Sequence, residues 1–366
     1  MVKRPSVDRT LFITTLVLVV GGLFIFLSAS LGLLARNGAQ FSDIAIGQLV
    51  LGFGGGLVAL VVLSNIPYRI WRKYALYIFI LALFGMALVF VPGLGVELKG
   101  ARRWVDLGII TFQPSEFLKI AYIIYLATWL SGVKAKVADM RHGLIPFAIV
   151  SAITGLALLV QPDTDTFLVI AVAGIAMFWA SGARMRDIAI IVGVGLIGLV
   201  ILVSMRPYLA DRLTTFLDPS ADSQGKGYQI QQSLLAIGSG EIFGRGFGQS
   251  IQKFNKLPEP ISDSIFSVYA EEFGFVGSVM LILAFLTFAM RGLWVAARSP
   301  DMFGGLLTVG IVILIVFQSF LNIGAMLGIL PLTGLPLVFI SHGGTALMSA
   351  LASVGIVLSV SRSVHT

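Results

Sequence analysis

Long apolar segments run through this 366-residue chain and limit what it can fold into. A helix needs about 20 apolar residues to cross the hydrocarbon core of a bilayer. Segments of about this length lie at 11–34, 46–64, 74–92, 114–131, 143–160, 165–181, 187–204, 264–290, 303–329 and 336–360. Only 12% of the residues are charged, against roughly 25% in soluble domains. We therefore expect an all-α polytopic membrane protein with about ten transmembrane helices, forming a single integral membrane domain over residues 1–366.

The basic residues in the gaps predict the orientation of the chain. Lys and Arg favour the cytoplasmic side of short loops, and here they recur in every second gap and beside both termini. The residues concerned are Lys3, Arg4, Arg9, Arg69, Arg72, Lys73, Lys134, Lys136, Arg141, Arg184, Arg186, Arg291, Arg298 and Arg362. Both termini are therefore predicted to be cytoplasmic. The first apolar segment is too long for a signal-peptide core and is expected to remain as the first span.

Three informative loops then fall on the predicted outer side, at 93–113, 205–263 and 330–345. The second, between the seventh and eighth spans, is the only one large enough to have structure of its own.

The composition excludes other kinds of site. The chain has no cysteine, which excludes disulfides, thiol nucleophiles and cysteine–metal sites. Its net charge of +7 is spread over membrane loops, so we expect membrane lipid as a partner and no nucleic acid.

The stretch LPEPISDSIFSVYAEEFGFVG at 257–277 passes from a polar, proline-rich loop into an apolar helix. It places Asp263 at the membrane surface, where a carboxylate is hydrated enough to ionise and close enough to act on a lipid head group. Asp263 is equally suited to cap the helix, and the two roles are compatible. Further on, Glu271 and Glu272 lie inside an apolar segment, where charges are costly and usually functional.

Basic residues also stand on the predicted outer side, against the usual bias. Lys99, Arg102 and Arg103 cluster beside Trp104 in the 93–113 loop. Guanidinium groups match phosphate geometry, so an anionic ligand at the outer leaflet would explain them. The alternatives are ion pairs of Arg102 and Arg103 with Glu97 or Asp106, or nonspecific contact with lipid.

Two further pairs of charged residues lie near the predicted outer ends of spans. Glu116 and Lys119 are three apart and share a helix face; they either form an internal ion pair or line a cavity that Asp263 faces. Asp163 and Asp165 stand in QPDTDT at 161–166, either as turn residues or as ligands of a divalent cation. The glycine-rich 238–250 segment lacks the ending of a phosphate loop.

One carboxylate and several cations at an outer surface suit glycosyl transfer from a lipid-linked diphosphate sugar. The carboxylate would take the proton of the acceptor hydroxyl. Arg, Lys or a divalent ion would neutralise the leaving diphosphate. A transporter would also use charges within spans, but the inverted repeats and broken helices typical of transporters are not evident. A scaffold for partner helices leaves the outer Arg and Asp residues unexplained.

Four blocks of sequence resemble the SEDS family of peptidoglycan glycosyltransferases, which comprises FtsW, RodA and SpoVE. They are GARRWVDLGIITFQPSEFLKI at 100–120, QPDTDT at 161–166, QQSLLAIGSGEIFGRGFGQSIQKFNKLPEPISDSIFSVYAEEFGFVG at 231–277, and NIGAMLGILPLTGLPLVFISHGGTALM at 322–348. The part QSIQKFNKLPE is more similar to the FtsW branch than to the RodA branch.

The resemblance implies polymerisation of lipid II at the outer face of the bacterial cytoplasmic (inner) membrane, in cell division or in cell-shape elongation. It implies Asp263 as the catalytic residue and a class B penicillin-binding transpeptidase as partner. The implied substrate-binding residues are Arg102, Arg103, Trp104, Gln113, Ser115, Glu116, Lys119 and Glu259. No organic cofactor is expected; a divalent cation (Mg or Mn) is a candidate. The alternative function is a lipid II flippase.

The chain departs from the family pattern at three places. The family usually has Leu-Gly in place of Thr164-Asp165, His-Thr in place of Ile261-Ser262, and Tyr in place of His342. Asp165 adds a carboxylate near the expected site, while Ile261 removes a histidine beside Asp263. The expected base itself is present.

Overall fold

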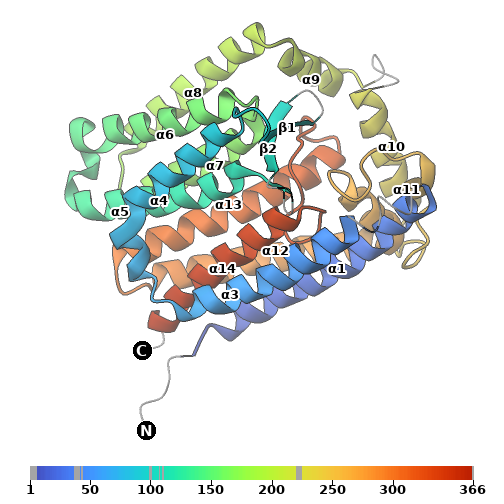
Figure 1. Cartoon of the computed structure of the whole chain (residues 1–366), viewed down its shortest axis with the longest axis horizontal. Coiled ribbons are helices and arrows are strands. Elements are labelled where there is room, and N and C mark those ends of the chain that lie inside the picture. Colours follow the sequence, from blue (N-terminus) through green and yellow to red (C-terminus); the bar gives the residue numbers. More distant parts are fainter. Residues whose placement is uncertain are drawn as a thin grey trace.

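The computed structural model describes residues 6–36, 42, 44–98, 101–106, 108, 111–219 and 225–364. They form a bundle of long helices with a small sheet and three shorter helices at one end (Figure 1). The elements are α1 (Arg9–Arg36), η1 (Gly47–Gly55), α3 (Gly56–Asn65), α4 (Arg69–Leu88), β1 (Gly95–Leu98), β2 (Ala101–Asp106), β3 (Thr111–Phe112), α5 (Pro114–Val133), η2 (Lys134–Ala138), η3 (Met140–Leu144), α6 (Ile145–Leu159), α7 (Thr164–Ala180), α8 (Met185–Met205), α9 (Pro207–Leu217), α10 (Lys226–Ser239), α11 (Gln252–Asn255), α12 (Ile265–Ala297), α13 (Met302–Met326) and α14 (Gly344–Val364).

The described residues contain nine helices that are long and apolar enough to cross a membrane, and α7 is a tenth, shorter apolar helix. Each predicted span overlaps one of these ten, so the prediction of a polytopic helical protein is confirmed. The last span was predicted to begin at 336, which is wrong. Residues 327–343 form an irregular loop, and α14 begins only at Gly344. Two prolines and a glycine, Pro331, Pro336 and Gly334, interrupt helical backbone within that loop.

The chain alternates between two ends of the bundle. At one end, here called the terminal pole, Arg291 Nη2 lies 2.6 Å from Asp8 Oδ2, and the Asp8 N–H donates to Ser361 Oγ at 3.0 Å. Both termini lie at this end in Figure 1. The opposite end, the loop pole, carries the sheet and α9 to α11. An even number of spans with both termini on one side agrees with the sequence prediction.

The sheet in the 93–113 loop was not predicted. It is a three-stranded antiparallel sheet of order β1-β2-β3, with Val96 opposite Trp104 and Val105 opposite Phe112. Its strands are too short for a clear alternating pattern. Val105 is fully buried, and β2 packs against α5, since so small a sheet is not stable by itself.

The helices differ strongly in how far they are buried. In α13 and α14, 72% of the most apolar window is buried, and in α5 61%. These three helices therefore form the centre of the bundle. In α8 the corresponding value is 0%, which places α8 at the periphery. Gly310 of α13 allows the close packing at the centre, because a side chain there would meet the sulfur of Met177 and a methyl group of Ile123.

The helix α12 is broken at Gly274, whose φ is +65°. The segment 241–246 fills the break: Arg245 N and Gly246 N donate to the carbonyls of Glu271 and Glu272, each at 3.0 Å. In return, the N–H groups beyond the break donate to carbonyls of this segment. The sequence analysis found no evident broken helix, and this one was missed. Backbone groups freed within a membrane protein must find partners, and here a loop supplies them. The remaining helix, 275–297, is long enough to span at about 1.5 Å per residue.

Candidate functional site

A tight loop at the loop pole presents Asp263 just before α12. Glu259 has a positive φ of +49°, and its carbonyl accepts from the N–H groups of Ser262 and Ser264, both at 3.1 Å. Asp263 is half-buried, and its Oδ1 accepts from Ser262 Oγ at 3.2 Å. The N-cap position of α12 is Ser264, so the predicted capping position of Asp263 is wrong by one residue.

Hydrogen bonds from two other segments hold the backbone around Asp263. Asn322 Nδ2, in α13, donates to the carbonyl of Asp263 at 2.8 Å. From the loop between α13 and α14, Ser341 Oγ donates to the carbonyl of Ser262 at 2.7 Å, and His342 N to that of Ile261 at 2.7 Å. The carboxylate is thus carried by a loop whose backbone is fixed at three successive residues.

Asn322 was missed by the sequence analysis. It is fully buried, and the same Nδ2 also donates to the carbonyl of Leu335 at 2.9 Å. It therefore joins the Asp263 loop to the loop between α13 and α14. The signal was present: Gln318 and Asn322 are polar residues one turn apart in an otherwise apolar span, where such residues usually have a function.

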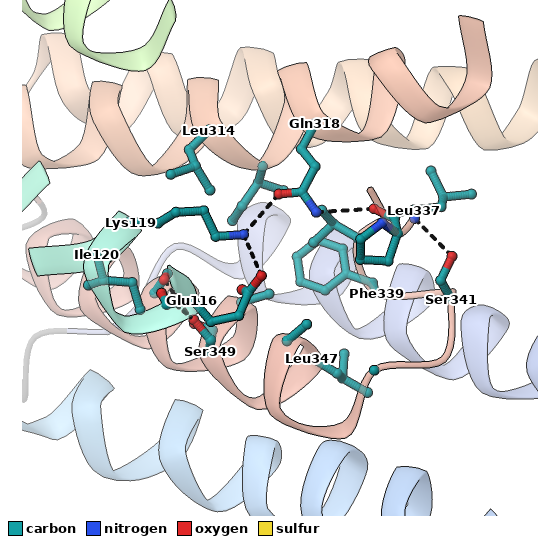
Figure 2. A pocket seen from close by; sticks show the side chains of 17 residues that line it. Glu116, Lys119, Ile120, Leu314, Gln318, Leu337, Phe339, Ser341, Leu347 and Ser349 are labelled. Atoms are coloured by element: carbon teal, nitrogen blue, oxygen red, sulfur yellow. Dashed lines mark hydrogen bonds and ion pairs between the residues drawn. The ribbon is translucent and has the colours of Figure 1, made fainter. Parts of the chain in front are cut away.

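Glu116 and Lys119 form a buried ion pair in α5, with Lys119 Nζ 2.8 Å from Glu116 Oε1. Lys119 also donates to Gln318 Oε1 at 3.0 Å, and Gln318 Nε2 donates to the carbonyl of Pro336 at 3.1 Å (Figure 2). These side chains line a cavity that Ser341 also borders. Its volume open to water is about 30 Å³, which is room for about two water molecules and not for a sugar. The predicted internal ion pair is confirmed. The two side chains also line a cavity, but Asp263 is not among the residues that line it, so the predicted cavity shared with Asp263 is wrong for this one.

The start of α5 holds two further predicted residues. Gln113 precedes Pro114, which occupies the first turn of the helix, and its Nε2 lies 3.4 Å from Asp163 Oδ2. Ser115 is fully buried, and its hydroxyl has no hydrogen-bond partner among the residues described. Gln113 therefore stands close to the 161–166 turn rather than in the Asp263 loop itself.

The two arginines of β2 have different surroundings. Arg102 Nε lies 3.2 Å from Glu97 Oε2, and both side chains are more than half exposed; this confirms one of the predicted alternatives. Arg103 is mostly buried and donates to the carbonyls of Gln161 and Pro162. Its nearest carboxylate is Asp163, at 3.7 Å, so the predicted pairing with Glu97 or Asp106 is wrong for Arg103.

Trp104 is half-buried on the same strand. A β-bulge interrupts the regular alternation of faces at this point, because Trp104 pairs with Val96 and Arg102 pairs with the next residue, Glu97. Lys99, which the sequence analysis grouped with these residues, lies outside the described residues. The exposed Arg102 is therefore the member of the cationic cluster best placed to meet a ligand.

The aspartates of the 161–166 turn are both engaged by arginines. Asp163 is buried at the N-cap of α7, and burial raises the pKa of its carboxyl while the charge of Arg103 opposes the rise. Both oxygens of Asp165 lie 2.8 Å from Arg212 Nη1. Asp163 accepts from the Thr166 N–H and from Gln113 and lies beside Arg103. With Asp165 bound to Arg212 as well, the two carboxylates do not fit a divalent cation. Across the described ranges no group of three or more His, Asp or Glu side chains comes together.

The buried carboxylates of α12 are also paired. Glu272 binds Lys253 Nζ at 2.7 Å and accepts from Ser28 Oγ of α1 at 2.6 Å. Glu271 accepts from Ser250 Oγ at 2.6 Å and from the N–H of Ile251 at 3.0 Å. They attach the 248–253 segment to α1 and α12, which gives these charges a structural role.

Known proteins are similar to this chain along nearly its whole length. The family model described as "Cell cycle protein", FTSW_RODA_SPOVE, matches residues 8–366. The chain belongs to this family. The matched residues include all four sequence blocks that resemble the family. These blocks run from β2 into α5, through the 161–166 turn, from α10 into α12, and from the end of α13 into α14.

Relatives within the FtsW/RodA/SpoVE family cover most of the chain. "Stage V sporulation protein E" of Bacillus subtilis is 38% identical over 98% of each chain. "Probable peptidoglycan glycosyltransferase FtsW" of a Geobacter species is 38% identical over 84% of this chain and 83% of that protein. A chain in a solved peptidoglycan synthase complex, concerned with the coordination of polymerization and crosslinking, matches with a TM-score of 0.79 and 28% identity over 97% of this chain and 98% of that chain.

Proposed function

We propose that this protein is a peptidoglycan glycosyltransferase that polymerises lipid II at the outer face of the bacterial cytoplasmic membrane. The activity is the one in the name of its FtsW relative. The basic residues of the terminal pole support a cytoplasmic location for that end, which leaves the Asp263 loop outside. The single observation that carries the proposal is a half-buried carboxylate on a backbone fixed at three successive residues.

In the proposed reaction, Asp263 takes the proton of the acceptor sugar hydroxyl. The acceptor oxygen forms a bond to the anomeric carbon of the donor, and the bond from that carbon to the lipid diphosphate breaks. The diphosphate leaves as an anion and needs no general acid. A positioned base contributes about 10²–10⁴ in rate, and the bonds from Asn322 and Ser341 keep this base at one place relative to the membrane.

The diphosphate requires a cation, and Arg102 is the best candidate among the predicted residues. Its pair with Glu97 is exposed, and such pairs stabilise proteins by at most about 1 kcal/mol, so a diphosphate can replace Glu97 at little cost. Arg103 and Lys119 are held by buried partners. We assign no step to a metal ion, because the paired carboxylates of the 161–166 turn do not fit one.

The test is lipid II polymerisation by Asp263→Asn, with the partner transpeptidase present and its transpeptidation blocked. We expect glycan chains from the wild type and none from the variant. Asp139→Asn is the matched control, since Asp139 pairs with His142 in the gap between α5 and α6 at the terminal pole; it should polymerise normally. Glycan chains from Asp263→Asn would refute the assignment of Asp263 as the base. Translocation of lipid II without polymerisation by the wild type would favour the flippase.

The proposed partner is a class B penicillin-binding transpeptidase, supported by the similarity to a chain of a peptidoglycan synthase complex. We assign the protein to the FtsW branch on the QSIQKFNKLPE block. Depletion in the native host should then block division and give filaments. Rounded cells would instead place the protein in elongation.

A further inference from the structure

The position of α8 depends on what holds its C-terminal end, which leads into α9. Of this helix, which the structure describes in full, only Asp187 is buried. The helix lies along the edge of the bundle in Figure 1 and leads through Arg206 directly into α9. Since Asp187 is the one buried residue of α8, the contacts of α9 contribute to where this part of the chain sits against the bundle.

An ion pair between Arg212 and Asp165 joins α9 to α7. Arg212 Nη1 lies 2.8 Å from both oxygens of Asp165, and the two side chains are only 18% and 13% exposed. Tyr208, one turn before Arg212, lies under its guanidinium group and is 3.4 Å from Thr164 Oγ1. The pair is therefore a partly desolvated attachment of α9 to the first turn of α7.

Asp165 has a second partner on the other side. Its Oδ2 accepts from the backbone N–H of Gly334 at 3.2 Å. The next residue, Leu335, offers its carbonyl to Asn322, and the same amide group of Asn322 holds the carbonyl of Asp263. A continuous path of hydrogen bonds and one peptide link thus runs from Arg212 to the proposed base.

We propose that Asp165 is a positioning residue for the proposed glycosyl transfer, coupling α9 to the loop that supports Asp263. One carboxylate binds the guanidinium of α9 and the N–H of Gly334 together, so α9 and the 334–335 backbone keep a fixed relation. The inference rests on the proposed function for its effect on rate. Its effect on the loop is independent of that function.

Two variants separate the two bonds of Asp165. The charge-swapped double variant, Asp165→Arg with Arg212→Asp, restores an ion pair between α7 and α9. Arginine at position 165 has no acceptor for the Gly334 N–H. Asp165→Ala removes both bonds. The readouts are hydrogen exchange of the 207–217 and 330–343 peptides, which needs no activity, and the turnover number and KM of lipid II polymerisation.

We expect Asp165→Ala to increase exchange in both peptides and to lower the turnover number about 10–100-fold, since a small misplacement of a catalytic group has effects of this size. The charge-swapped double variant should restore protection from hydrogen exchange in the 207–217 peptide but not in the 330–343 peptide, and its turnover number should stay low. The proposed coupling of α9 to the loop that supports Asp263 is wrong if the double variant restores both activity and the protection of both peptides. It is also wrong if Asp165→Ala changes hydrogen exchange in neither peptide. If the wild type does not polymerise lipid II but the variants show the expected pattern of hydrogen exchange, the proposed glycosyltransferase function is refuted and the proposed coupling is supported.

Discussion

At the scale of single residues, Asn322 connects more of the site than any residue singled out from the sequence. Its buried amide group donates to two carbonyls on two loops. Asn322→Ala leaves both carbonyls without this donor, at a cost of about 1–3 kcal/mol for each buried group left unpaired. We expect a lower melting temperature and a turnover number reduced at least tenfold. Ser319→Ala is the control, since the one partner of the Ser319 hydroxyl among the described residues is the carbonyl of Ile315 in its own helix; it should polymerise normally.

His342 should make stability depend on pH. Burial lowers the pKa of its imidazole below the ordinary 6.5, while Glu259 opposes the fall. The native state then binds fewer protons than the unfolded state, so stability is complete above about pH 6.5 and decreases as the pH falls towards the native pKa. His342→Phe should flatten the decrease in melting temperature between pH 7.5 and pH 5. Parallel curves for wild type and variant would contradict this assignment.

At the scale of elements, the break in α12 depends on Gly274. A Cβ there would come within 2.3 Å of Gly244 N and 2.6 Å of Ile242 O. The backbone at φ +65° and ψ −162° lies in a region open essentially only to glycine, which costs other residues about 1–3 kcal/mol. Gly274→Ala should displace the 241–246 segment and lower the melting temperature markedly. Gly195→Ala in α8 is the control, because a Cβ there meets nothing within 4 Å. Equal melting temperatures for the two variants would contradict a requirement for glycine in the break.

The attachment of α11 to α1 and α12 depends on Lys253, which is fully buried with Glu272. Removing one partner of a buried ion pair typically costs about 3–5 kcal/mol. Lys253→Met alone should therefore destabilise the protein strongly, and Lys253→Met with Glu272→Gln should recover part of the loss. Thermal unfolding of the single and double variants in detergent measures the coupling, and simple additivity of the two losses would refute it.

At the scale of the whole molecule, the two poles should lie on opposite sides of the membrane. The chain has no cysteine, so single cysteines report their own location. Glu241→Cys, exposed at the loop pole, should react with a membrane-impermeant maleimide in intact cells. Lys136→Cys, exposed in the gap between α5 and α6, should react only after permeabilisation. The reverse pattern would invert the proposed orientation.

Much of the site was foreseeable where the residues are close in sequence. The Glu116–Lys119 pair follows from helical spacing, and Asp263 from the change from polar loop to apolar helix. The partners of Arg103 and Asp165 were not foreseeable, because they are separated by 58 and 47 residues. The break at Gly274 was missed because a lone glycine in an apolar run is usually tolerated within a helix.

By itself, the sequence determined the number and order of the spans, the common side of the termini and the place of Asp263 at the end of a span. These follow from segment length, charge distribution and local polarity, which act over a few residues. Only the tertiary structure decided which charges are paired and which remain at the surface. It joined Arg103 to the 161–163 turn, Lys253 to Glu272 and Arg212 to Asp165, and left Arg102 exposed. The reason is physical: a buried charge takes the nearest available partner in space, and packing brings that partner from a distant part of the chain.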